Sequence, residues 1–491
     1  MQRRKLRKIG PGTACLLGMG GASLLSATSG AAFAQQRPGS VERFERQLEQ
    51  IQRATRVQAD TSLPVDQRML VEYGGYVSGS FAAIDDPDQE THVLRQYDLV
   101  GYGRVNIDGA HELFARVRTT YRDFNAGDSF DQHGDDWVEP TLDRAHYRFD
   151  LQRYMESTSG VTPKANVTVQ AGRQLINWGN GLTLSEEIDG VDATLSVENV
   201  SLELLAGCTR NSISDFDSSR PGFLGDTQRA FFGGMLSAQL GTHRPYVYGL
   251  IQRDNNDQDT LTVNGVNTEF AYDSFYVGVD SSGALSDRFL YGFELVYEGG
   301  EGLSNSFEFP FAQVDQTEEQ IHAFAADVRL DYLLSDRNQT RIGAELIFAT
   351  GDSDRQNTST TFGGNESGTD DTAFNSFGLI NTGLAFAPDV SNVLIGRVGA
   401  STFPLIDSKV FNRLQVGVDA FVFTKANPDA PIDEFTGDSR YLGAEADLFV
   451  NWQISSDVAL TLRYGCFFPG EAIETDHDER HFFFTGLTYA F

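Results

Sequence analysis

Long apolar runs are almost absent from this chain of 491 residues. Outside the N-terminus, no stretch approaches the roughly 20 apolar residues that a membrane-spanning helix needs. Basic residues are also scarce, because 38 Lys and Arg stand against 69 Asp and Glu, for a formal net charge of −31. This balance argues against nucleic acid as a partner, since phosphate contacts need clustered basic side chains. The chain is therefore expected to be neither a helical membrane protein nor a nucleic-acid binder.

Cysteine is equally scarce, with three residues. Cys208 and Cys466 both fall on rows that alternation predicts to be apolar, so a lipid-facing Cys466 is favoured as a small hydrophobe over half of a disulfide. Residues 127–136 carry oxygen ligands that suit Ca²⁺, but without the spacing of an EF-hand, and solvated charge is their default interpretation. The sequence therefore predicts no metal site and no cofactor.

The N-terminus has the features of an export signal. Five basic residues lie between Arg3 and Lys8, residues 15–25 are apolar, and Ala32-Phe33-Ala34 fits a cleavage site. We therefore predict a cleaved secretory signal peptide at residues 1–34. Its removal takes away five basic residues and no acid, so the mature charge becomes 33 − 69 = −36.

Residues 35–66 follow a different period from the rest of the chain. Val41, Phe44 and Leu48 have helical spacing, and Ser40 is suited to the N-cap. The pattern predicts an amphipathic helix of about five turns. A solvated periplasmic helix is the default interpretation. Docking under the following domain, self-pairing, entry into its pore, and binding of a periplasmic export or cell-wall partner remain alternatives.

From Leu70 onward the period changes to two. Segments of about 10–14 residues alternate between apolar and polar side chains, as in outer-membrane barrels. We predict strands at 70–83, 93–107, 111–123, 141–151, 164–176, 182–195, 199–210, 228–240, 243–253, 270–280, 287–298, 319–333, 339–350, 373–385, 409–424, 441–454, 457–468 and 480–491. Residues 391–402 are the main ambiguity. The predicted fold is all-β: a transmembrane antiparallel β-barrel of about 18 strands over residues 67–491, preceded by a short helix.

The last strand and the connections support a closed barrel in the outer membrane. Residues 481–491 (HFFFTGLTYAF) place large apolar groups on one row up to the terminal Phe491, an edge that would invite aggregation if left open. A terminal Phe of this kind resembles the assembly signal of bacterial outer-membrane barrels. Tight turns such as Asp108-Gly109 alternate with long acidic connections such as 351–372. We expect outer-membrane lipid and lipopolysaccharide around the barrel.

Charged residues in the predicted strands should face the inside, because a charge on the lipid face costs on the order of 2–4 kcal/mol near the midplane. The expected inward residues are Arg104, Arg116, Arg118, Arg122, Arg144, Arg148, Arg329, Arg341 and Arg463, with Asp98, Asp150, Asp327, Glu345, Glu445 and Asp447. Two interpretations remain open. The residues form ion-paired ladders that brace a wet interior, or some arginines are free to face a moving anion. The favoured anion patch runs over neighbouring strands from Arg116 to Arg148.

Several segments resemble a known family. They are 172–179 (GRQLINWG), 189–191 (DGV), 344–352 (AELIFATGD), 442–448 (LGAEADL) and 464–470 (YGCFFPG). Their order resembles the alginate-export-type outer-membrane porins. The resemblance implies a monomeric barrel of 18 strands that passes an acidic exopolysaccharide through an arginine-lined constriction.

The resemblance also suggests Arg173 as a pore residue. Simple alternation instead places Arg173 on the row of Val167, Val169 and Ala171, so a pore position would need a bulge or a place at the rim. This conflict makes Arg173 a useful residue to locate in the structure.

Three functions follow from these observations. The first is a channel for anionic solutes, an acidic polysaccharide such as alginate among them. The second is a structural or receptor barrel with a closed lumen. The third is an outer-membrane hydrolase, which is disfavoured because His146 and His322 have no convincing serine partner on a nearby strand, and His322 shares a row with Phe324 and Val328.

Overall fold

The computed structural model describes residues 69–491 apart from 130–133, 211–212, 218, 224, 226, 257–259, 264–265, 309–311, 359, 361–363 and 476. The predicted signal peptide and the predicted helix in 35–66 lie outside these residues. No helix in the described part of the chain is both long enough and apolar enough to cross a membrane.

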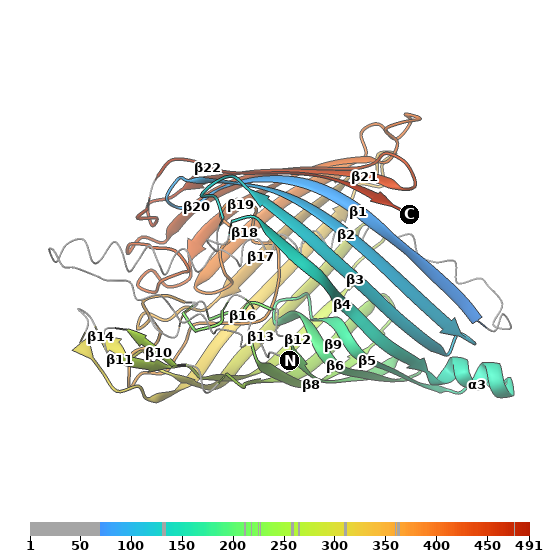
Figure 1. The fold of residues 1–491 in the computed structure, drawn as a ribbon, viewed down its shortest axis with the longest axis horizontal. Coiled ribbons are helices and arrows are strands. Elements are labelled where there is room, and N and C mark those ends of the chain that lie inside the picture. The colour runs from blue at the N-terminus through green and yellow to red at the C-terminus, as the bar shows by residue number, and fades with distance from the viewer. Residues whose placement is uncertain are drawn as a thin grey trace, which may run out of the picture.

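The described chain forms a closed antiparallel barrel of 18 strands, which confirms the predicted fold class (Figure 1). Closure is made by β1 (Met69–Asp85) against β22 (Arg480–Ala490), with Tyr76 opposite Ala490. The remaining barrel strands are β2 (Thr91–Ile107), β3 (His111–Phe124), β4 (Asp136–Asp150), β5 (Ala165–Trp178), β6 (Leu184–Val197), β7 (Val200–Thr209), β8 (Arg229–Ala238), β9 (His243–Asp254), β12 (Tyr272–Ala284), β13 (Phe289–Leu303), β16 (Glu318–Leu333), β17 (Arg341–Ala349), β18 (Val393–Thr402), β19 (Leu414–Lys425), β20 (Tyr441–Gln453) and β21 (Val458–Pro469).

The two ends of the barrel differ, as the connection lengths predict. Short turns and the one described helix, α3 (Leu151–Ser159), lie at the end that is periplasmic in outer-membrane barrels (Figure 1, right). Long connections gather at the other end, and two of them carry the small hairpins β10 (Thr260–Val263) with β11 (Val266–Glu269) and β14 (Phe307–Glu308) with β15 (Ala312–Gln313).

Side chains alternate between the two faces of the wall, apart from register shifts between β3 and β4 and between β19 and β20. On the outer face Leu113 is 54% exposed and Val247 is 49% exposed, whereas the inward Tyr248 is 3% exposed. The exposed apolar rows are the surface that a bilayer would cover, because lipid is their only suitable solvent. Charged residues on the opposite rows therefore face the lumen.

One predicted strand is wrong. Residues 373–385 do not join the barrel, and the ambiguous segment supplies the missing strand, β18 (Val393–Thr402). The alternation in 373–385 has another cause. The connection between β17 and β18 folds back into the barrel, where Phe374 and Phe377 are buried against inward side chains. We call residues 373–386 the lumen segment.

The lumen segment crosses the barrel from wall to wall. Near one end, Phe377 packs against Phe231 on β8, with ring centroids 5.1 Å apart. At the other end, Phe386 stacks on Phe467 of β21 at 4.3 Å. These are the eighth and seventeenth of the 18 strands around the barrel, so they lie on opposite sides. The segment therefore narrows the lumen.

Candidate functional site

The main hydrophobic core lies inside the barrel, around the lumen segment. Its buried members come from β5 to β9, β12, β13, β16 to β21 and the connections between them. Within the described residues, β2, β3 and β4 contribute nothing to this cluster. A second, small cluster packs Leu384 and Ala385 against Leu94, Phe482 and Phe484. The lumen side of β3 and β4 is thus left polar, and it is where the predicted arginines lie.

The arginine wall consists of Arg104, Arg116, Arg118, Arg122, Arg144 and Arg148 on β2, β3 and β4. The register places Arg116 opposite Arg144, and Glu112 opposite Arg148. The strands therefore bring these side chains onto one inner surface. Like charges on directly opposite positions repel unless carboxylates lie between them.

Most of this wall is neutralised by carboxylates. Arg116 donates to both oxygens of Asp143 at 2.9 and 2.8 Å, and Arg118 lies 2.9 Å from Asp98. Asp98 also accepts hydrogen bonds from Ser78 and Thr120. Arg104 pairs with Glu72 at 3.0 Å and approaches Glu112 at 3.7 Å, and Arg144 approaches Glu187 at 3.9 Å. These pairs fit the bracing interpretation of the wall.

Three arginines of the lumen, one in this wall and two on other strands, differ because their side chains have no hydrogen bond or close ion pair to any residue that the structure describes. They are Arg148, Arg244 and Arg329, which we call the mouth arginines; carboxylates such as Glu112, Glu203 and Asp327 reach them only through longer-range electrostatics. Arg148 and Arg244 are exposed. Each lies within a few residues of the periplasmic end of its strand, on β4, β9 and β16.

Arg244 was not selected from the sequence, although the alternation of Arg244, Tyr246 and Tyr248 against Val247 could have identified it. Arg397 was missed for a different reason, because it lies in the ambiguous segment. It donates to Glu345 at 2.6 Å and to Asp419 at 3.0 Å.

The carboxylates on the far wall are mostly shielded. Asp280, Glu294 and Asp327 lie directly opposite one another on β12, β13 and β16, and each is at most 1% exposed. The β5–β6 turn covers them, because Asn180 donates its backbone N–H to Glu294 at 2.9 Å. Tyr248 also donates to Glu294, at 2.5 Å. These acids are therefore screened from the passage.

The other predicted residues have varied positions. Arg341 pairs with Asp331 at 2.6 Å, and Arg463 donates to Asn451 at 2.8 Å while lying over the ring of Phe449. Asp447 is 4% exposed. Asp150 accepts a hydrogen bond from the backbone N–H of Arg153 and caps α3, so it belongs to the periplasmic rim.

Arg173 does not lie with the other arginines. The register continues without a bulge through Arg173 and Asp189, which places Arg173 on the outward row with Ala171. The two side chains form a bidentate ion pair with both contacts at 2.7 Å. The pair neutralises a charge on the outer face, so alternation was the better guide here than the family resemblance.

Glu445 has a specific role in holding the lumen segment. It is 2% exposed, and its carboxylate accepts backbone N–H groups from Leu384, Ala385 and Phe386 at 2.5, 2.8 and 2.8 Å. Gly383 beside them has φ +102°, and a Cβ there would lie 2.8 Å from the Glu445 carboxylate. The sequence identified Glu445 as inward but gave no sign of this contact.

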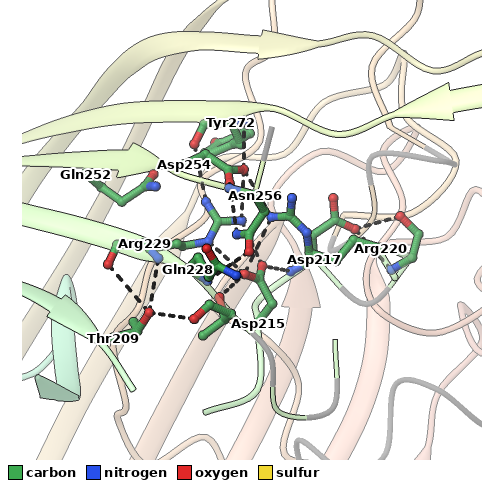
Figure 2. Close-up of polar contacts among 12 residues, drawn as sticks. Thr209, Asp215, Asp217, Arg220, Gln228, Arg229, Gln252, Asp254, Asn256 and Tyr272 are labelled. Carbon is green, nitrogen blue, oxygen red and sulfur yellow. Dashed lines mark hydrogen bonds and ion pairs between the residues drawn. The ribbon is translucent and has the colours of Figure 1, made fainter. Parts of the chain in front are cut away.

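The opposite end of the lumen segment is held by a buried ionic cluster (Figure 2). The figure shows the guanidinium groups of Arg220 and Arg229 among the carboxylates of Asp215, Asp217 and Asp254. Arg229 donates to both oxygens of Asp215 at 2.8 Å, and neither side chain is exposed. Arg229 also lies 5.2 Å from the ring of Phe377. The cluster thus ties the β7–β8 connection and the lumen segment to β8.

We expect acid to weaken this cluster. Burial alone would raise the pKa of Asp215, but the charges of Arg229 and Arg220 outweigh burial and lower the pKa to about 2. Because an unfolded Asp titrates near pH 4, the pair stabilises the fold above about pH 4 and loses this contribution as the pH falls towards 2.

The same contact can be tested by mutation. Asp215→Asn should lower the free energy of unfolding by about 3–5 kcal/mol, because it leaves Arg229 buried with a weaker partner. The change in free energy is measured by urea unfolding, with the heat-modifiable migration of the barrel in gel electrophoresis as the readout. Asp407→Asn, which breaks only the exposed pair with Arg337, is the matched control, and equal stability of the Asp215 variant and the wild type would contradict the prediction.

Two comparisons relate the chain to known proteins. Residues 222–485 match the family model for alginate export. Similar solved structures are OccAB3 of Acinetobacter baumannii (12% identity, TM-score 0.53, covering 86% of this chain and 99% of that one) and OccK8 (OprE) of Pseudomonas aeruginosa (8%, 0.51, 86% and 98%). OccK11 (OpdR) of Pseudomonas aeruginosa is a third (10%, 0.50, 86% and 95%). No curated protein matches. At these identities the likeness to the solved structures concerns the fold.

Proposed function

The chain belongs to the alginate export family of outer-membrane β-barrel channels, and we propose that it passes anionic solutes, an acidic exopolysaccharide such as alginate among them, along its arginine-lined inner wall. The observation that carries this proposal is the contrast in exposure between charges of opposite sign. Arg148 and Arg244 are exposed at the periplasmic mouth, whereas Asp327 is 1% and Asp447 4% exposed. Among these lumen residues the exposed charges are therefore positive, although the chain as a whole is strongly acidic.

The mouth arginines are suited to a first contact with a carboxylated chain. A guanidinium group presents a planar set of donors that matches a carboxylate, and one without a fixed partner can exchange one anion for the next. Rings of Arg select anions in pores. The ion-paired residues Arg104, Arg116, Arg118, Arg144 and Arg341 then form a neutralised track rather than a trap that would hold the anion.

We expect the triple variant Arg148→Gln/Arg244→Gln/Arg329→Gln to lose anion preference. The chloride-to-potassium permeability ratio should fall by about 3- to 10-fold, because about 0.7–1.4 kcal/mol of favourable potential at the mouth is removed. Reversal potential in a planar bilayer under a KCl gradient measures the ratio. Polyuronate added on the periplasmic side should block the wild type and should block the triple variant more weakly.

Arg253→Gln is the matched control, because it removes an exposed arginine from the outer wall, where Arg253 pairs with Asp273 at 2.7 Å. A cation-selective wild type whose reversal potential does not change in the triple variant would contradict the proposal.

A closed structural or receptor barrel is the second candidate. The crossing of the lumen by residues 373–386 favours it, because the segment is anchored at both ends. The two candidates differ in conductance, since a closed barrel gives no channel with or without the segment. Catalysis is not indicated, because His146 lies in the lumen 3.8 Å from Glu112 and His322 lies on the outer wall.

A further inference from the structure

Four histidines are paired with tyrosines on the outer wall. Nδ1 of His111 lies 2.7 Å from the hydroxyl of Tyr147, and Nδ1 of His243 lies 3.1 Å from that of Tyr291. The same contact joins His322 to Tyr297 at 2.7 Å and His481 to Tyr464 at 3.0 Å. The ring centroids in the four pairs are 6.1, 5.6, 6.4 and 6.0 Å apart. One local geometry is thus repeated four times.

The pairs lie at two heights, at the two edges of the apolar band. His111 and His243 are the first residues of β3 and β9, which begin at the periplasmic end. His322 and His481 lie near the starts of β16 and β22, which begin at the opposite end. Between the two heights the outer rows are apolar, as at Leu113 and Val117 on β3. Aromatic side chains at these edges lie at the level of lipid headgroups.

The pairing requires specific neighbours. His243 and Tyr291 are two strands apart, and the residue between them in the register is Gly283. A Cβ on Gly283 would lie 3.0 Å from Nδ1 of His243. On the periplasmic side, Tyr154 of α3 packs edge-on against His111 at 5.9 Å. These contacts fix the ring orientation, so the pairs are built features rather than scattered surface histidines.

The geometry leaves one nitrogen of each imidazole available. Tyrosine engages Nδ1, and among the residues that the structure describes none bonds to Nε2 of these four histidines. When the tyrosine hydroxyl donates to Nδ1, the ring proton resides on Nε2 and is directed away from the pair.

We propose that the four histidine–tyrosine pairs bind the phosphate groups of membrane lipids, with Nε2 of each imidazole donating to a phosphate oxygen. Phosphate is the strong acceptor found at both edges of a bilayer's apolar band, and a charge-assisted hydrogen bond to it is stronger than one to an ester or sugar oxygen.

The groups around each pair are compatible with this role. His111 faces Tyr147, Phe149 and Tyr154, and it forms no ion pair with any residue in the described part of the chain. Tyr291, the partner of His243, shares its hydroxyl with Ser281. Near His481 the carboxylate of Asp85 accepts the backbone N–H of His481 and leaves the imidazole ring to its tyrosine.

The test is lipid retention by the purified full-length barrel, measured by native mass spectrometry. Phosphatidylglycerol is compared with a diacylglycerol glucoside of the same acyl chains, which has no phosphate. The wild type should retain at least about threefold more phosphatidylglycerol than the glucoside, because only the phosphate offers a charged acceptor to Nε2.

The variant His111→Gln/His243→Gln/His322→Gln/His481→Gln should lose this excess of phosphatidylglycerol. His92→Gln/His477→Gln removes two histidines that are not in such pairs and should keep it. Two double variants, His111→Gln/His243→Gln and His322→Gln/His481→Gln, each remove the pairs at one end of the barrel. They assign the bound phosphate to one leaflet of the membrane. They also replace the quadruple variant in the test if that variant does not fold. Equal retention of the two lipids by the wild type, or an excess that survives in both double variants and the quadruple variant, would overturn the proposal.

Discussion

Replacing Glu445 by Gln is expected to raise the single-channel conductance by at least about twofold, because the lumen segment that narrows the pore loses its anchor on β20. The carboxylate accepts three consecutive backbone N–H groups of the lumen segment, and an amide can accept only through its one oxygen. At least one of the three backbone N–H groups then faces the NH2 group of the new amide, which is also a donor, in a buried site. A hydrogen bond to a charged group contributes about 1.5–3 kcal/mol, so much of the anchor at β20 is lost.

The conductance of two further variants brackets this result. Gly383→Ala should act in the same direction as Glu445→Gln, because a Cβ at Gly383 is strained at φ +102° and approaches the same carboxylate. Replacing residues 378–389 by a short Gly-Ser linker gives the upper limit. Glu471→Gln, which alters an exposed carboxylate beyond β21, is the matched control. A channel that stays closed in every variant would favour the structural or receptor barrel.

The barrel could be read from the sequence because its signal is repeated in every strand. Lipid outside and polar groups inside impose a period of two on each crossing, and connections of alternating length fix the direction. All but one of the predicted strands lie in the barrel. The exception, 373–385, alternates because the lumen segment also has an apolar face, which packs on Phe231 and Phe467 inside the barrel.

The same reasoning predicted only part of the candidate site. Alternation showed that Arg116 and Glu445 face inward, but their partners lie elsewhere in the chain. Asp143 is positioned by a β-bulge, and the backbone that Glu445 binds belongs to a connection 59–61 residues away. Neither partner follows from a local pattern. The distinction between ion-paired and free arginines therefore needed the structure, as did the outward position of Arg173.

The second large effect concerns stability, and it separates wall arginines that brace the barrel from those that meet solute. Arg116→Met is expected to lower the free energy of unfolding by about 3–5 kcal/mol, because it leaves the Asp143 carboxylate buried without its partner. Arg116 is 4% and Asp143 5% exposed, so water cannot replace the lost contact. The double variant Arg116→Met/Asp143→Leu should recover most of the loss, since burying neither charge is often neutral.

Urea unfolding of Arg116→Met, Asp143→Leu and the double variant completes a double-mutant cycle. The mouth variant Arg148→Gln is the comparison. Arg148 has no close ion pair among the described residues, so its removal should change stability by less than about 0.5 kcal/mol while changing ion selectivity. If Arg148→Gln lost stability and Arg116→Met changed ion selectivity instead, the bracing role would belong to Arg148 and the solute contact to Arg116. An Arg116→Met barrel of full stability that no longer responds to polyuronate would place the solute contact at Arg116 and make the Asp143 pair dispensable.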